Sequence, residues 1–267
     1  MMSTFSSIFK MNVKQQFQYR TAAISGMVTQ FFFGFMQIAL FTAFLSQGES
    51  EFTVPQMASY IWLQQCFFTL FKYWDTCKPE ISEKIVNGDM AYQLIRPMNL
   101  YDFWFQTVLS KSFGSFLMRA IPLSLVVVWL PAGLGLMAPV SLLNFLLFLV
   151  SAVIGAFLVT AIVMIAYIIS LYTLSPAGVF SFLVAVAGLL AGQIVPLPML
   201  PESVQTIFSF FPFRYVSDLP YRIFIGNING TDALVQIGIQ LAWLVGLVLI
   251  GKLVMNKKLK KLVVQGG

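Results

Sequence analysis

The chain has 267 residues, of which 58% are hydrophobic and only 10% are charged, and its mean hydropathy is +0.84. A soluble domain could not cover its surface with so few charged side chains, so the composition predicts an integral membrane protein. Histidine is absent, which excludes histidine-based acid-base catalysis, imidazole metal ligands and Ser-His triads.

The N-terminal segment, residues 1–20, has the pattern of an amphipathic helix on the cytoplasmic membrane surface. Over residues 3–20, apolar side chains recur at helical spacing on one face, and lysines lie mostly on the other. A solvated helical lead-in is the alternative, because such stripes have weak specificity. The apolar face consists of Phe5, Ile8, Phe9, Val13 and Phe17, and the polar face holds Lys10, Lys14 and Gln18.

Six apolar stretches follow that are typical of membrane-spanning helices. Lysine and arginine are concentrated in segments 1–20, 72–100 and 252–267, which hold twelve of them, whereas the segments assigned to the outside hold two. This asymmetry predicts that both termini are cytoplasmic, with 252–267 as a basic tail, and it explains the net charge of +6 without nucleic-acid binding. The predicted spans are 22–45, 57–71, 103–130, 141–171, 177–195 and 233–253.

The cytoplasmic loop between the second and third spans is predicted to contain a short helix over residues 76–88. Pro79 suits a first helical turn, acidic residues favour the positive end of the helix dipole, and Asn87-Gly88 supplies a stop. Ile81 and Ile85 share a face that is expected to sit in a cleft on a partner protein, although an ordinary capped loop helix carries the same signals. The candidate partner contacts are Pro79, Glu80, Ile81, Glu83, Lys84, Ile85, Gly88 and Arg96.

Polar residues within the spans are the candidates for a translocation pathway. In the third span, four polar side chains recur every four residues, and Arg119 lies roughly 16 Å below Pro131 by helical rise, close to mid-bilayer. An arginine at that depth must face the bundle or a wet cavity, where it contacts an anionic or polar substrate, or pairs with backbone carbonyls or another subunit. For the glutamines, interhelical hydrogen bonds are the default role and pore lining is the alternative. The pathway candidates are Gln64, Gln65, Lys111, Ser115, Arg119 and Gln193.

Residues 196–231 are predicted to form an external helical hairpin that re-enters the membrane. Three prolines stand at 196, 198 and 201, so the fifth span should end at Val195 and a separate short helix should cover 202–211. That helix is too apolar for water and too short to span, which indicates a position in the outer membrane interface.

Arg214, Asp218 and Arg222 are each four residues apart and could form an ion-paired row, but Pro220 is expected to interrupt the helix. A solvated external face is therefore the preferred interpretation. Small residues also recur at helical spacing, and close packing within one subunit is favoured over contact between subunits. They are Gly188 and Gly192 in the fifth span, and Gly238, Ala242 and Gly246 in the sixth.

Two motifs carry a resemblance to a known family. The first is G-x-I-x-P-L-x-x-L-P-E at 192–202, followed by F-P-F at 211–213 and P-Y-x-I-F-I-G at 220–226. The second is IVNGDMAYQLIRPMNL at 85–100, in which a glycine precedes Leu-x-Arg-Pro. In this order and on opposite sides of the membrane, they resemble the membrane subunits of the type-2, export branch of ABC transporters.

The resemblance implies a permease subunit in a bacterial plasma membrane, with the helix at 76–88 as the coupling helix to a separate ATPase. It also implies two ATPase copies that bind ATP and Mg, and a second permease that is either the same chain or a sibling. Arg96 would then pair with the ATPase or with lipid phosphate, or serve as a positive-inside anchor. With 27 phenylalanines, the bundle suits an amphipathic or hydrophobic cargo.

The chain itself shows no chemistry of an enzyme. The sequence has no G-x-x-x-x-G-K-[ST] phosphate-binding loop, so ATP hydrolysis is assigned to the partner, and no cofactor is expected in this chain. Cys66 and Cys77 have no metal-ligand spacing, and no metal site is predicted. An ion-coupled secondary transporter is the first alternative, but no acidic residue falls inside a predicted span. A non-transporting membrane scaffold subunit is the second.

Overall fold

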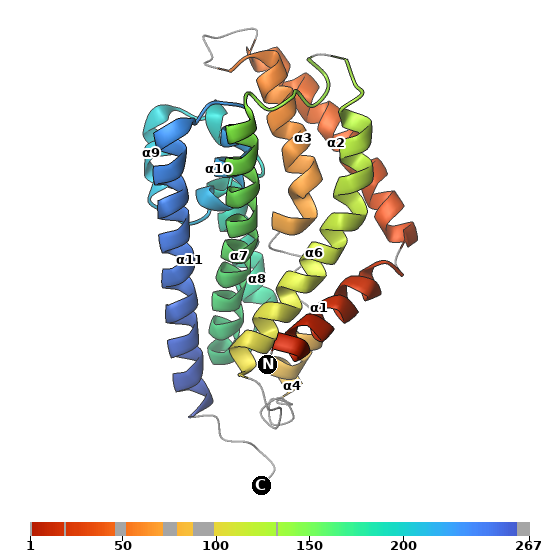
Figure 1. The fold of residues 1–267 in the computed structure, drawn as a ribbon. Helices are drawn as coiled ribbons and strands as arrows, with labels where there is room; N and C mark the ends of the chain where they lie inside the picture. Colours follow the sequence, from red (N-terminus) through yellow and green to blue (C-terminus); the bar gives the residue numbers. More distant parts are fainter. Residues whose placement is uncertain are drawn as a thin grey trace.

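The computed structural model describes residues 2–18, 20–45, 52–71, 79–87, 99–131 and 133–260. Within these ranges all regular structure is helical, with ten α-helices and one short 3-10 helix (Figure 1), which confirms the all-α prediction. The elements are α1 (Met2–Gln16), α2 (Arg20–Leu45), α3 (Val54–Phe71), α4 (Pro79–Asn87), α6 (Leu100–Val127), α7 (Leu142–Thr173), α8 (Pro176–Leu190), η2 (Leu197–Met199), α9 (Glu202–Ser209), α10 (Arg214–Phe224) and α11 (Gly230–Leu259).

Three of these helices are long and apolar enough to cross a membrane. They cover Thr21–Leu45, Leu142–Thr173 and Gly230–Leu259, and they coincide with the first, fourth and sixth predicted spans. The other three predicted spans fall on α3, α6 and α8. Glutamines dilute the hydropathy of α3, charged residues dilute that of α6, and α8 is short. The number of six spans therefore stays a prediction.

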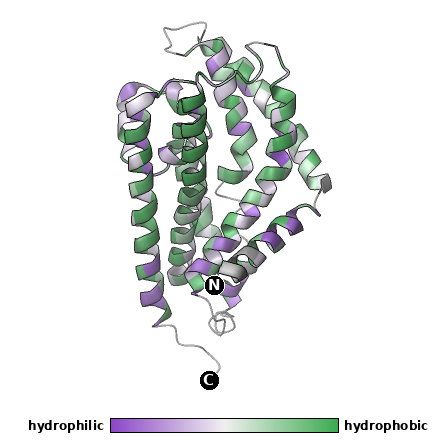
Figure 2. Cartoon of the chain, in the orientation of Figure 1, coloured by the Kyte–Doolittle hydropathy of each residue, from purple (hydrophilic) through white to green (hydrophobic). Residues whose placement is uncertain are grey.

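Helix α7 is the centre of the fold. It contacts α11, α10, α8, α6, α3 and α4, and side chains around most of its circumference are buried. The Ser141 hydroxyl accepts from the Asn144 amide at its start, and Leu174 ends it in the left-handed conformation. Figure 2 shows the hydrophobic colour along α7, whereas hydrophilic residues gather on α1 and at the lower end of α11.

The fifth predicted span ends earlier than expected. Helix α8 stops at Leu190, because Gly192 adopts φ +70° and closes the helix with two capping bonds. The Gln193 amide donates to the Gly188 carbonyl at 3.1 Å, and the Gly192 amide donates to the Leu189 carbonyl at 3.2 Å. The prediction that Pro196 sets the end was wrong, since a glycine cap acts first.

The segment between α8 and α11 folds back against the bundle. The short helix predicted at 202–211 is confirmed as α9. The following helix, α10, continues through Pro220 and buries every residue from Tyr215 to Phe224, mainly against α7 and α3. Pro220 has no backbone N–H to donate to the Val216 carbonyl, and this carbonyl instead packs against Gly155 of α7. The predicted interruption at Pro220 was therefore wrong.

The small residues of the sixth predicted span have a different environment from the expected one. A methyl group added at Gly238 or Gly246 would meet no atom of the described residues within 4 Å. The prediction that this series packs within the subunit was wrong for both positions, because α7 covers another face of α11. The face that carries the two glycines is open.

Candidate functional site

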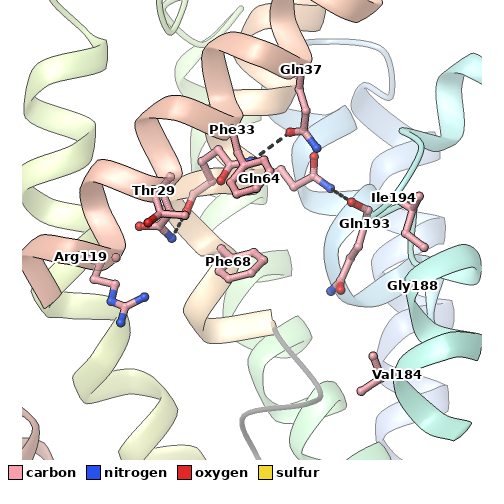
Figure 3. A pocket seen from close by; sticks show the side chains of 13 residues that line it. Thr29, Phe33, Gln37, Gln64, Phe68, Arg119, Val184, Gly188, Gln193 and Ile194 are labelled. Carbon is pink, nitrogen blue, oxygen red and sulfur yellow. Dashed lines mark hydrogen bonds between the residues drawn. The ribbon is translucent and has the colours of Figure 1, made fainter. Parts of the chain in front are cut away.

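A cavity of about 410 Å³ lies between α2, α3, α6, α8 and the turn after α8 (Figure 3). Four of the six predicted pathway residues line it, namely Gln64, Gln65, Arg119 and Gln193. They come from three separate segments of the chain, so the fold brings together what the sequence left apart. The predicted pathway did not include the other lining residues, which are Gly26, Thr29, Gln30, Phe33, Gln37, Phe68, Val184, Gly188 and Ile194.

Two glutamines fasten the turn after α8 to α3. Gln64 donates through Nε2 to the backbone carbonyls of Gly192 at 3.1 Å and of Gln193 at 3.0 Å. In return, Gln193 donates through Nε2 to the Phe71 carbonyl at the end of α3, at 3.1 Å. The interhelical hydrogen bonds expected as the default role of these glutamines are therefore present, and the same side chains line the cavity.

A second pair of amides joins α2 to α3. Gln30 donates through Nε2 to the Gln65 carbonyl at 3.0 Å, and Gln65 donates through Nε2 to Gln37 Oε1 at 3.0 Å. Gln30 and Gln37 are seven residues apart on α2 and thus lie on one face of that helix. This spacing was the available sequence signal for both residues.

Arg119 reaches from α6 onto the backbone of α2. Its Nη2 donates to the Ala22 carbonyl at 3.4 Å, and its guanidinium rests on Gly26, where a methyl group would lie 2.5 Å from Cζ. The side chain is partly exposed and lines the cavity. Arg119 thus makes the backbone pairing that was one alternative, and it also lines the cavity. Its contact with a substrate, the other alternative, stays a prediction.

Lys111 and Ser115 do not join this cavity. Lys111 borders a separate hollow of about 340 Å³ between α1, α4 and α6, together with Lys84. Ser115 donates to Gln16 Oε1 on α1 at 3.0 Å. The cause is helical geometry. Polar residues four positions apart on α6 are rotated by about 40° from one to the next, so this row turns from the side of α6 that faces α1 to the side that faces α2.

Helix α4 exposes a different face from the expected one. Ile81 and Ile85 are 3% and 2% exposed and belong to the chain's own core, where α4 contacts α7 and α8. The expectation that they sit in a cleft on a partner was wrong. Among the side chains of α4 whose burial is described, Glu83, Val86 and Asn87 are exposed and Lys84 is half-buried. Pro79 and Glu80 form the start of α4, and Gly88 and Arg96 lie outside the described residues.

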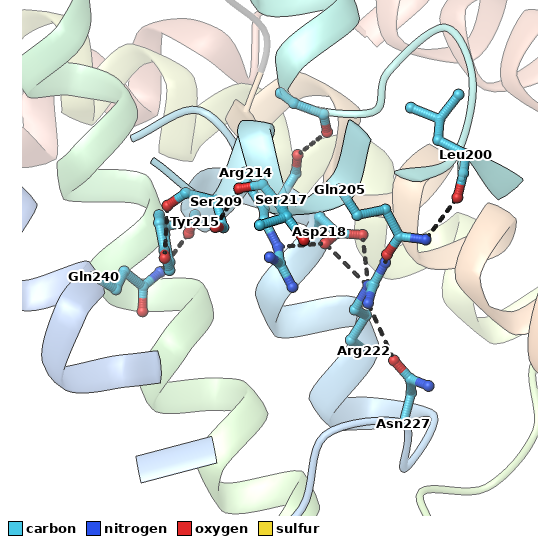
Figure 4. A network of polar contacts seen from close by, with 12 residues as sticks. Leu200, Gln205, Ser209, Arg214, Tyr215, Ser217, Asp218, Arg222, Asn227 and Gln240 are labelled. Atoms are coloured by element: carbon cyan, nitrogen blue, oxygen red, sulfur yellow. Dashed lines mark hydrogen bonds and ion pairs between the residues drawn. The ribbon is translucent and has the colours of Figure 1, made fainter. Parts of the chain in front are cut away.

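A buried ionic network stands where a solvated face was expected (Figure 4). Asp218 is completely buried, accepts from the Tyr60 hydroxyl at 2.8 Å, and pairs with the Nε atoms of Arg214 at 3.4 Å and Arg222 at 3.1 Å. The prediction of a solvated row was wrong, because α10 continues through Pro220 and keeps all three charges in register. The spacing of four residues was the correct signal.

The same network connects α10 with the segments around it. Arg222 donates through Nη2 to Gln205 Oε1 on α9 at 2.6 Å and through Nη1 to Asn227 Oδ1 at 3.4 Å. Tyr60 attaches it to α3. Asp218 is therefore a buried carboxylate that forms ion pairs with two arginines. It lies in α10, which is not one of the three long apolar helices.

The comparisons with known proteins place the chain in a family. A family model described as ABC-2 family transporter protein matches residues 26–266, which is most of the chain. The matched range includes the whole cavity lining, all of α4 and the network around Asp218. No curated protein and no solved structure matches the chain.

Proposed function

Because the chain belongs to the ABC-2 family of transporter membrane proteins, we propose that it is the permease half of an ATP-driven exporter. A separate ATPase, present in two copies that bind ATP and Mg, would supply the energy. A second permease, either a copy or a sibling, would complete the pathway. The cargo is amphipathic or hydrophobic, in keeping with the Phe33 and Phe68 walls of the cavity.

The proposed topology uses six spans in a bacterial plasma membrane. These are α2, α3, α6, α7, α8 and α11, with both termini in the cytoplasm. In this arrangement α1 lies on the cytoplasmic interface, and α9 and α10 form the external re-entrant hairpin. The burial of α10 supports this assignment, because an 11-residue helix is too short to cross a bilayer, yet protein covers it from Tyr215 to Phe224.

The observation that carries the coupling proposal is the position of α4. It packs through Ile81 and Ile85 into the core beside α7 and α8, and it leaves Glu83 and Val86 exposed. A partner that pushes on the exposed face would move α8, the helix that α4 contacts. The turn after α8 is fastened to α3 by Gln64, so the movement would reach the cavity.

The test is a mild-detergent pull-down of the tagged chain from its native membrane, followed by an ATPase assay and transport into vesicles. Wild type should retain an ABC ATPase, and Glu83→Ala with Lys84→Ala should lose transport while still inserting into the membrane. The matched control replaces Glu202 and Lys257, an exposed acid and an exposed base on other helices. Unchanged ATPase association and transport in the α4 variant would contradict the coupling proposal.

The ion-coupled alternative is tested in the same vesicles. If the proton gradient is collapsed while ATP is maintained, transport should persist. Loss of transport under these conditions would instead favour ion coupling. Asp218 gives that alternative little support, because its carboxylate is neutralised by Arg214 and Arg222.

A further inference from the structure

Arg119 is the charged side chain in the lining of the cavity of Figure 3. Its guanidinium has five N–H donors, and the described residues provide one acceptor for them, the Ala22 carbonyl at 3.4 Å from Nη2. Among the residues that the structure describes, no carboxylate pairs with Arg119 and none lines the cavity. Arg119 is half-buried, and Ala22 and Thr29 nearby on α2 are exposed, so its charged end is accessible.

Gly26 gives the guanidinium its place at the cavity wall. A Cβ at this position would lie 2.5 Å from both Cζ and Nη1 of Arg119, so the glycine lets the guanidinium rest against the α2 backbone. Gly26 lines the cavity as well. The close approach therefore holds a positive charge at the part of the wall nearest to the N-terminal end of α2.

The apolar part of the wall lies further along the same helix. Phe33 follows Gly26 by seven residues, so both lie on one face of α2, roughly 10 Å apart by helical rise. Phe33 and Ile194 are 44% and 59% exposed, and Phe68 adds a third apolar side chain to the lining (Figure 3). The cavity thus has a positive end and an apolar end, both with accessible surface.

The charge of Arg119 selects the chemistry of a head group. In the proposed topology α6 is a span, and an arginine within a span costs free energy unless it is compensated. An oxyanion can accept two parallel N–H bonds from a guanidinium, which makes it a stronger partner than a neutral head group. A cationic head group would be repelled.

We propose that this cavity binds an amphipathic anion. Its oxyanion head group accepts hydrogen bonds from Arg119, and its apolar part extends along α2 against Phe33, Phe68 and Ile194. The volume of about 410 Å³ is in the range of small-molecule sites. This inference rests on the proposed function, since it names the cargo class of the same cavity.

The test uses the purified full chain in phosphatidylcholine nanodiscs, without ATPase, and measures the probe concentration that gives half-maximal thermal stabilisation. Decyl phosphate carries both the anion and the apolar chain. Decanol lacks the charge, decyltrimethylammonium reverses it, and inorganic phosphate lacks the chain. We expect decyl phosphate to act at a concentration about tenfold lower than any of the other three, the order of one charge-assisted hydrogen bond. Identical lipids keep the membrane partitioning of each probe the same for every variant.

Variants assign this preference to the cavity. Arg119→Gln should remove the preference for decyl phosphate over decanol, whereas Lys257→Gln, which deletes an exposed positive charge outside the cavity, should retain it. Phe33→Ala should weaken decyl phosphate about fivefold, because part of the apolar wall is lost. The matched control is Phe44→Ala, since Phe44 is 57% exposed on the same helix but does not line the cavity.

Equal action of decyl phosphate and decanol on wild type would overturn the inference, and that comparison needs no variant. Arg119 would then be left to a carboxylate of a second subunit or to water. A preference that persists in Arg119→Gln would also overturn it, since the probe would then bind elsewhere. So would a preference that Lys257→Gln removes as well, since it would then come from the net charge of the protein.

These outcomes separate from those of the proposed function. An anion preference without any co-purifying ATPase would refute the exporter and keep the inference. ATP-driven transport without an anion preference would do the reverse.

Discussion

Replacing Asp218 with asparagine should be one of the most damaging conservative changes in this protein. The side chain keeps its shape and can still accept from Tyr60, but Arg214 and Arg222 lose the anion between them. Breaking a buried ion pair by removing one partner costs about 3–5 kcal/mol, because the remaining charge is buried without compensation. At about 2–4 °C per kcal/mol for a chain of this size, the melting temperature should fall by roughly 10 °C.

The assay uses the protein's own thiol. Cys66 on α3 is free and 3% exposed, so a thiol-reactive dye reports unfolding in a Cys77→Ser background. The matched control is Asp102→Asn, which breaks the ion pair between Asp102 and Lys252 at 2.8 Å. The Asp102 side chain is 50% exposed and the Lys252 side chain is 41% exposed. An exposed pair contributes about 0–1 kcal/mol, so this control should melt within about 3 °C of wild type. Equal shifts for the two variants would refute the claim that burial makes the Asp218 network strong.

Two further predictions concern packing. Gly155→Ala places a methyl group 2.5 Å from the Val216 carbonyl, and such overpacking should lower the free energy of unfolding by about 1–3 kcal/mol, seen as a lower melting temperature. Gly246→Ala has open space around it and should melt at or slightly above the temperature of wild type. Similar melting of the two would mean that α10 can move away from α7. Ile85→Ala should lower the free energy of unfolding by about 2–5 kcal/mol, because Ile85 is buried. Val86→Ala, at a position 58% exposed, should change the free energy of unfolding by no more than about 0.5 kcal/mol. The Val86 variant should nevertheless weaken ATPase capture in a pull-down. Full ATPase capture by the Val86 variant would remove this position from the docking face.

Part of the candidate site was predictable from the sequence because polar residues are costly in apolar surroundings wherever they occur. Gln64, Gln65, Arg119 and Gln193 stand out in apolar helices for this reason, and all four line the cavity. Lys111 was selected by the same argument but borders the separate hollow between α1, α4 and α6. Residues four positions apart share one face of a helix only over a few turns, because each step rotates by about 40°. The sequence could not say which helix each polar face meets.

The sequence by itself determined the composition-driven properties of this protein. Its low charge and long apolar runs predicted a helical membrane protein, its Pro-rich segment predicted α9, and its two motifs predicted the family that the match over 26–266 confirms. These signals are local or additive, so they need no knowledge of neighbours.

Tertiary structure alone decided what each helix face contacts. The buried state of Asp218, the inward turn of Ile81 and Ile85, and the joining of α3 to the end of α8 all depend on residues more than 25 positions apart. Pro220 illustrates the reason. The sequence alone shows that a proline inside a helix removes one backbone hydrogen bond. It does not show that α10 continues through Pro220, or that the freed Val216 carbonyl packs against Gly155, because this contact exists only in the folded chain.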